Sequence, residues 1–165
     1  MDHRLRERLR VRLAQERGYY RYPAGARTRF ALVYPNTYFV GMSNLGLHIV
    51  YALLNERSDT ACERVFLPDR DEMSRYVRTN TPMMSVETQT PLADFAIVGF
   101  AISFEMDYFH VAEMLARSHI TPLAADRTAH DPLVIAGGPC ATFNPEPLAA
   151  LIDAVVIGEG EAILP

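Results

Sequence analysis

The stretch FALVYPNTYFVGMSNLGLHIVYALLNE, residues 30–56, decides the fold because it contains a strand, a loop and a helix in that order. Its first five residues, FALVY, form the short continuous apolar run that is typical of a parallel strand covered on both faces. Residues 44–56 repeat apolar side chains at helical spacing, and Ser43 or Asn44 can cap the first exposed amides of that helix. The loop between them, YPNTYFVGMSNLG, lies where open α/β sheets often bind ligands.

The remainder of the chain repeats this alternation. Strands are predicted at residues 62–67, 94–103, 132–138 and within 153–161, and helices at residues 70–78, 105–118 and 145–151. Strands that alternate with helices favour a parallel sheet with right-handed crossovers. At 165 residues and 49% hydrophobic content, the chain can bury one core. We therefore expect an α/β fold with a doubly wound, mainly parallel five-stranded sheet of the Rossmann-like or flavodoxin-like type.

Residues 1–29 form an arginine-rich helical arm and connector ahead of the α/β domain, which we place at residues 30–165. Nine arginines against three acids give the arm a net charge of +6, whereas seven arginines against seventeen acids give the domain −10. Leu5, Leu9 and Leu13 are four apart, which indicates a helix with one apolar stripe. Such a helix can dock on the acidic remainder of the chain, on a second copy or on a part of the protein outside this sequence. Nucleic-acid binding is not expected, because no aromatic-rich basic sheet or groove-reading motif accompanies the arginines.

The two cysteines, Cys62 and Cys140, are far apart and form no CxxC pair, zinc-finger spacing or disulfide framework. Two thiolates cannot hold a cluster that needs three or four. The simplest interpretation is that both are small packed side chains in a reducing compartment. The longest apolar runs, such as residues 95–102, are too short to span a bilayer, and the first thirty residues are charged rather than signal-like. The sequence therefore predicts a cytoplasmic protein with no membrane partner.

Four loops of unusual composition follow predicted strands. They are PNTYFVGMSN, SFEMD, GGPCATFNPEP and GEGE. Because the carboxyl ends of parallel strands lie on one edge of a sheet, we expect these loops to meet there. Gly137 and Gly138 either let the backbone approach a ligand or only make a tight turn, and Pro139 fixes the exit of that turn. The sequence therefore predicts a ligand site built from several loops.

Other chemistries have weaker support in these loops. A dinucleotide fingerprint needs a third glycine where Ile163 stands after GEGE. Glu105 and Asp107 can act as an acid and a base, although carboxylates in a first helical turn also simply favour the positive end of the helix dipole. No cluster of histidine, cysteine and carboxylate residues has metal-ligand spacing. A receiver module needs acids where Asn36 and Ser103 stand, so that alternative and a flavodoxin-like flavin carrier are both disfavoured.

Taken in order, the loops resemble the amino-terminal region of radical S-adenosylmethionine (radical SAM) proteins that carry a cobalamin-binding-type domain ahead of a catalytic barrel. The motifs are PNTYFVGMSNLG, VETQTPLADFAIVGF, the pair Glu105 and Tyr108, AGGPCATFNPEPLA and DAVVIGEGE. The resemblance as a whole covers the chain from about Arg21 to its last residue. The spacing of AGGP, NPEP and VVIGEGE is the most specific part of the resemblance.

The resemblance implies a cofactor site at the carboxyl edge of the sheet. Cobalamin-binding domains often carry DxHxxG after the first strand, with the histidine as the lower cobalt ligand, and Asn36, Tyr38 and Gly41 stand at that spacing here. A neutral phenol is a poor cobalt ligand, so bound cobalamin is expected in a histidine-off form. Ser103 matches the family's serine after the third strand, and the Gly137-Gly138 pair matches its glycine pair near the nucleotide tail.

The expected cofactor-site residues are Asn36, Tyr38, Gly41, Ser43, Ser103, Glu105, Gly137, Gly138, Pro139, Glu159, Gly160 and Glu161. No catalytic residue and no metal ligand is assigned. In the family, a CxxxCxxC motif holds a 4Fe-4S cluster that binds S-adenosylmethionine, and that motif is absent from these 165 residues. The resemblance implies a domain that is truncated before the radical SAM barrel, catalyses nothing alone and covers the barrel's active site. The alternative is a vestigial structural or substrate-recognition domain that has lost cobalamin.

Overall fold

The computed structural model describes residues 2–23 and 25–164. Its elements, in chain order, are α1 (His3–Ala14), β1 (Thr28–Thr37), α2 (Tyr38–Met42), α3 (Leu45–Glu56), β2 (Thr60–Leu67), α4 (Arg70–Thr79), the 3₁₀ helix η1 (Leu92–Asp94), β3 (Ile97–Ala101), α5 (Asp107–Arg117), η2 (Ala124–Asp126), β4 (Leu133–Gly137), α6 (Pro139–Phe143), η3 (Glu146–Leu148), β5 (Ala154–Val155) and α7 (Gly160–Ile163). Within that part of the chain, no helix has both the length and the apolar character to span a bilayer.

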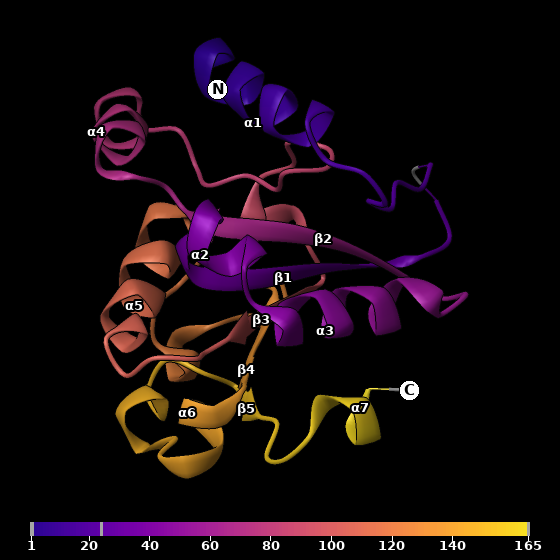
Figure 1. The fold of residues 1–165 in the computed structure, drawn as a ribbon. Coiled ribbons are helices and arrows are strands. Elements are labelled where there is room, and N and C mark those ends of the chain that lie inside the picture. The colour runs from indigo at the N-terminus through magenta and orange to yellow at the C-terminus, as the bar shows by residue number, and fades with distance from the viewer. Residues whose placement is uncertain (1, 24, 165) are drawn as a thin grey trace.

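The five strands form one sheet in the order β2-β1-β3-β4-β5, and every neighbouring pair is parallel. This arrangement confirms the predicted doubly wound α/β fold. The chain passes from β1 to β2 on one side and then returns to β3 on the other, so the strand order reverses between β1 and β3 (Figure 1). Open α/β sheets bind ligands at such a switch point, outside the carboxyl ends of the strands.

The side chains of β1 alternate between two hydrophobic cores. Ala31 and Val33 belong to the core that also contains the buried face of α5. Leu32 and Tyr34 belong to the opposite core, which contains the buried face of α3. On this α3 side, Ile135 of β4 is only half-buried. The sheet face beside α3 is therefore less completely covered than the face beneath α5.

The outer edge of β2 is covered by residues 83–91 and by α1. Val86 donates its amide to the Arg64 carbonyl at 2.9 Å, and the Glu87 carboxylate accepts the Arg64 amide at 2.8 Å. α1 lies outside this segment (Figure 1), and the leucines of its predicted stripe are buried: Leu5, Leu9 and Leu13. Because an open strand edge can pair with other chains, this cover protects the sheet.

The arm docks on the acidic remainder of its own chain, which is one of the expected alternatives. Arg12 of α1 pairs with Glu72 of α4 at 2.8 Å, and Asp2 pairs with Arg75 at 2.7 Å. The Arg12–Glu72 pair joins the basic arm to the acidic domain, whereas the charge signs are reversed in the Asp2–Arg75 pair. Self-association through the arm stays a prediction.

The connection after β1, expected as a loop, contains the helix α2. Thr37 is extended, and the chain enters the helix at Tyr38. A Cβ at Gly41 would overlap the ring of Phe66, so the glycine lets α2 pack directly against β2. This contact joins residues that are distant in sequence, so the periodicity of the connection alone does not reveal it.

The last part of the sheet is less regular than predicted. The helix expected at residues 145–151 is only the single turn η3, which begins directly after Pro145. The loop after β4 begins with α6, and Pro139 suits the first position of that helix. The strand expected within residues 153–161 is the short β5, and the GEGE segment leads into α7.

Candidate functional site

A cavity of about 480 Å³ lies on the sheet face between α3 and α7 and extends to the carboxyl edge of the sheet. Its floor comes from β1, β3 and β4. The predicted site residues that line it are Ser103, Gly137, Gly138, Pro139, Glu159, Gly160 and Glu161. The structure thus brings Ser103, which follows β3, together with the predicted residues that follow β4 and β5, whereas Glu105 does not line the cavity.

The floor of the cavity is apolar and is built from small residues. Gly99 and Ala101 of β3 lie beside Ile135 and Gly137 of β4 in the parallel register. The Phe30 ring lies across Gly99, where an added Cβ would come within 2.6 Å of it. Small residues on two neighbouring strands therefore open this space, and Phe30 bounds it toward the amino ends of the strands.

Asn44 and Ser103 supply polar groups at the carboxyl-edge end of the cavity. Asn44 Nδ2 lies 3.3 Å from Ser103 Oγ and 3.4 Å from Tyr34 Oη. Asn44 Oδ1 accepts the Leu47 amide at 2.9 Å, so Asn44 is the cap of α3, one of the two predicted residues. Since Ser103 Oγ accepts from Asn44, its own hydroxyl proton can be donated to a ligand.

The short helix α7 forms one wall of the cavity. Gly160 lies close to α3, because a Cβ there would be 3.5 Å from Val50 Cγ2. Arg57 Nη1, just after α3, donates to the Leu164 carbonyl at 3.2 Å. The two acids of the GEGE segment are exposed at the rim. The wall is therefore a thin segment that contacts α3 through a glycine.

The two glycines after β4 have different structural roles. Gly138 has φ +98°, and a Cβ there would lie 2.7 Å from the Ile102 carbonyl oxygen. Its backbone conformation therefore requires glycine. At Gly137 a Cβ would meet Val156 Cβ at an ordinary 3.5 Å. Gly138 serves the turn, and Gly137 leaves space beside the cavity.

Replacing Gly138 by alanine is expected to lower the free energy of unfolding by about 1–3 kcal/mol, because the positive φ and the contact with Ile102 both oppose a side chain. Gly137→Ala is the matched control and is expected to change that free energy by less than about 1 kcal/mol. Urea unfolding followed by circular dichroism measures both values. Equal losses in the two variants would contradict the different roles of these glycines.

Three predicted site residues on or next to α2 do not line the cavity. Tyr38 Oη donates to Glu16 Oε1 at 2.8 Å. The pKa of Tyr38 is raised to about 12, mainly by burial of the side chain and secondly by its hydrogen bond with the Glu16 carboxylate. The phenol therefore stays neutral. Gly41 is buried, and the exposed Ser43 donates its hydroxyl back to the main chain of α2. α2 therefore offers no phenolate to a metal.

Asn36 lies in a second cleft, of about 720 Å³, between α4 and α5. Its Nδ2 donates to Oδ1 of the buried Asp107 at 3.1 Å. His110 lines the same cleft and donates from Nδ1 to the Pro35 carbonyl at 2.8 Å. Glu105 is exposed in the loop after β3. The lining of this cleft mixes both charge signs with apolar side chains, which indicates no single ligand chemistry.

Of the cavity floor, the sequence prediction names Gly137 and misses Gly99, Ala101 and Phe30. The sequence could have indicated Gly99, because a glycine inside an apolar strand often marks a place where other groups approach the backbone closely. The sequence does not indicate Phe30 or Ala101. Alternation along a strand tells which residues share a face of the sheet, but not which face borders a cavity. The site is thus deeper than the loops alone predict.

The described residues offer no evident metal site. Among residues 2–23 and 25–164, no group of three or more histidine, cysteine or acidic residues is arranged to hold a metal ion. Burial raises the pKa of the Cys62 thiol. The pKa of the Cys140 thiol is also raised, mainly by burial and secondly by the negative charge of Glu105. Both thiols are therefore neutral near pH 7, which agrees with packed side chains.

The protein-family model described as radical SAM proteins, N-terminal, matches residues 46–165. This chain belongs to that family. The matched region begins in α3 and includes β2 to β5 together with most of the lining of the cavity. The predicted membership in the N-terminal region of radical SAM proteins is therefore confirmed.

Two further proteins are similar to this member of the radical SAM N-terminal family. The uncharacterized protein MJ0966 of Methanocaldococcus jannaschii is 23% identical over 133 residues, which are 79% of this chain and 24% of that protein. This chain thus spans about a quarter of the length of that relative. A crystal structure of a cobalamin-binding protein from Desulfitobacterium hafniense has a TM-score of 0.48 and 14% identity, covering 84% of this chain and 56% of that chain. The family assignment rests on the family model alone.

Proposed function

We propose that this chain is the cobalamin-binding-like N-terminal domain of a radical SAM iron-sulfur enzyme, and that the cavity between α3 and α7 receives the nucleotide tail of cobalamin. The cavity is the observation that carries the proposal. It reaches the carboxyl edge near the β1–β3 switch point and is lined by Ser103, Gly137 and Gly138, which match the family's tail site. A crevice in that position is where open α/β sheets bind ligands.

The residues of the cavity fit the tail in size and in chemistry. Its volume of about 480 Å³ falls within the range of about 300–1,000 Å³ that is usual for small-molecule sites. The small apolar floor of Gly99, Ala101 and Gly137 suits a flat aromatic base. The Ser103 hydroxyl can donate a hydrogen bond to a ring nitrogen of that base. Pro139 and residues 159–161 would border the tail at the rim.

The lower cobalt ligand is proposed to be absent. Tyr38 is bonded to Glu16, and its raised pKa keeps it neutral. Residues 36–43 and Glu105 are proposed to border the corrin ring without coordinating its metal. When bound, cobalamin supplies a cobalt centre for radical or group-transfer chemistry.

The carboxyl edge carries exposed apolar side chains, which support docking of a further domain. They are Phe39, Leu45, Phe104, Met106, Phe109 and Phe143, and Phe39 and Phe143 are 81% and 88% exposed. Exposed apolar surface of this kind marks interaction sites. We propose that the radical SAM barrel of the same protein docks here, with the 4Fe-4S cluster and S-adenosylmethionine held by residues outside this chain. A cytoplasmic location and the absence of nucleic-acid binding stay predictions.

Titration with hydroxocobalamin tests the binding claim. The purified protein is expected to shift the visible spectrum of the cofactor from the base-on form of free hydroxocobalamin toward a base-off form, because a tail held in the cavity cannot also bind the cobalt, and to retain a stoichiometric amount through desalting. No spectral change and no retention would contradict the proposal. That outcome would favour the alternative of a vestigial domain that has lost cobalamin. One observation supports this alternative: the side chains of Asn36 and Tyr38 are hydrogen-bonded within the protein, to Asp107 and Glu16 respectively.

A further inference from the structure

A buried charged cluster of Glu16, Arg64 and Glu87 ties the N-terminal arm into the core. The Arg64 side chain is 2% exposed and that of Glu87 is 0% exposed. Arg64 Nε donates to Glu87 Oε1 at 2.7 Å, and Arg64 Nη2 donates to Glu16 Oε2 at 2.7 Å. Two carboxylates therefore share one guanidinium, and the connector that follows α1 supplies one of them.

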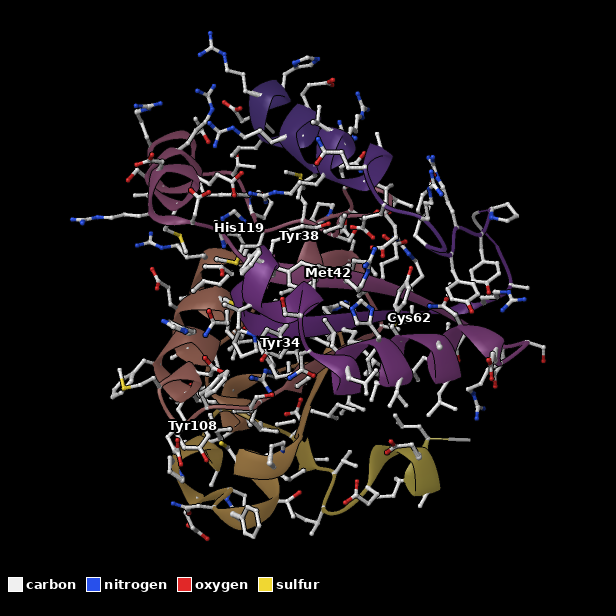
Figure 2. The ribbon with its side chains drawn as sticks, in the orientation of Figure 1. Tyr34, Tyr38, Met42, Cys62, Tyr108 and His119 are labelled. Atoms are coloured by element: carbon white, nitrogen blue, oxygen red, sulfur yellow. The ribbon has the colours of Figure 1, made fainter. Side chains whose placement is uncertain are left out.

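The same cluster holds both ends of α2. Tyr38, the first residue of α2, donates to the other oxygen of Glu16 at 2.8 Å. Met42, the last residue, has its Sδ 3.1 Å from Arg64 Nη1. Tyr38 and Met42 lie on the side of α2 that faces β2 and the arm (Figure 2). Arg12 of α1 also lies over the Tyr38 ring, 5.4 Å from its centroid. The orientation of α2 therefore depends on the docked arm.

α2 is connected directly to the polar end of the cavity. Asn44 follows α2 and donates its amide to the Gly41 carbonyl at 3.0 Å. The side chain of Asn44 then bonds Ser103 at 3.3 Å. A displacement of α2 therefore moves Asn44 and alters the contact that borders the cavity.

We propose that Glu16 is a positioning residue for this site: the docked arm orients α2, and α2 holds Asn44 against Ser103. Arm docking and occupancy of the cavity are then coupled. The inference rests on the proposed function only for the identity of the ligand. Because such coupling is reciprocal, a ligand that binds better with the arm docked also stabilises the docked arm.

Hydrogen exchange of the protein without cofactor tests the positioning role. Glu16→Gln removes the charge that Arg64 engages and keeps the size of the side chain, whereas Tyr38→Phe removes only the hydroxyl that links α2 to Glu16. Both substitutions are expected to speed amide exchange in residues 38–44 about tenfold, because α2 opens locally more often. Amides of β3 are expected to keep their exchange rates. Unchanged exchange in residues 38–44 of both variants overturns the proposal.

Glu7→Gln is the matched control for the loss of charge on the arm. Glu7 is an exposed carboxylate of α1 whose distance to Arg10 is 3.7 Å, at the solvent surface. Its replacement is expected to leave exchange in residues 38–44 at the wild-type rate. An increase equal to that of Glu16→Gln would mean that arm charge in general, and not the Glu16 contact, governs α2, which also overturns the proposal.

Limited digestion with trypsin tests the coupling. The arm has exposed arginines, including Arg10 and Arg17, so trypsin can cleave it when it leaves its docked position. Saturating hydroxocobalamin is expected to slow cleavage within residues 4–17 about fivefold or more in the wild type, and less in Tyr38→Phe. Equal rates with and without retained cofactor overturn the coupling. Failure of hydroxocobalamin to bind contradicts the proposed function instead, and the exchange experiment then decides the positioning role alone.

Discussion

Ala101→Phe is expected to abolish retention of hydroxocobalamin while the protein stays folded. Ala101 faces the α3 side of the sheet, next to Gly137 of β4. A benzyl group at this position enters the cavity of about 480 Å³ that we assign to the nucleotide tail. Because the ring and the tail cannot share that space, the affinity should fall at least about 100-fold, or about 2.7 kcal/mol. Titration followed in the visible spectrum measures the change.

The control for this substitution is Ala129→Phe. Ala129 is exposed in the loop between η2 and β4, so the same ring is added away from the cavity. This variant is expected to bind hydroxocobalamin as the wild type does, and urea unfolding should confirm that both variants fold. Wild-type affinity in a folded Ala101→Phe protein would mean that the tail does not occupy this cavity.

Arg64→Ala is expected to have the largest effect on stability, a loss of about 3–5 kcal/mol in the free energy of unfolding. The change leaves Glu87, whose side chain is 0% exposed, without its cation, and it also releases Glu16. Urea unfolding at pH 7 measures the loss. Arg117→Ala is the control, because that arginine is 45% exposed and lies 4.0 Å from Glu113. Its loss should stay below about 1 kcal/mol.

The deficit of the Arg64→Ala protein is expected to shrink in acid. Burial raises the pKa of Glu87, and Arg64 opposes that rise. Without Arg64, the pKa of Glu87 in the folded state moves further above its unfolded value of about 4.3. A carboxyl with a raised folded pKa costs stability above its unfolded pKa and costs none once both states are protonated. A deficit that stays constant from pH 7 to about pH 4 would contradict this origin.

The sheet could be predicted from sequence because parallel strands covered on both faces read as apolar runs between helical patterns. The loops at the carboxyl edge followed from that order, so Ser103, Gly137 and residues 159–161 were expected to meet. Their convergence needs only the parallel direction of the strands. The hollow above Gly99 and Ala101 could not be predicted, because it depends on which part of the sheet face α3 and α7 leave open.

The buried cluster around Arg64 was not predicted either. Glu63 and Arg64 interrupt an otherwise apolar strand, and charged residues in an edge strand ordinarily face water. The partners of Arg64, which are Glu87 and Glu16, come from a proline-containing linker and from the arm. No periodic pattern links segments so far apart in sequence. The direction in which the Tyr38 side chain points could not be predicted for the same reason, because it depends on where Glu16 docks.

Binding of cobalamin compared with cobinamide, which has the corrin ring and no nucleotide tail, tests the central claim most directly. If the tail occupies the cavity between α3 and α7, hydroxocobalamin should bind at least about tenfold more tightly than diaquocobinamide, and Ala101→Phe should remove that difference. Equal affinity of the wild-type protein for the two compounds, or no binding of either, would contradict it.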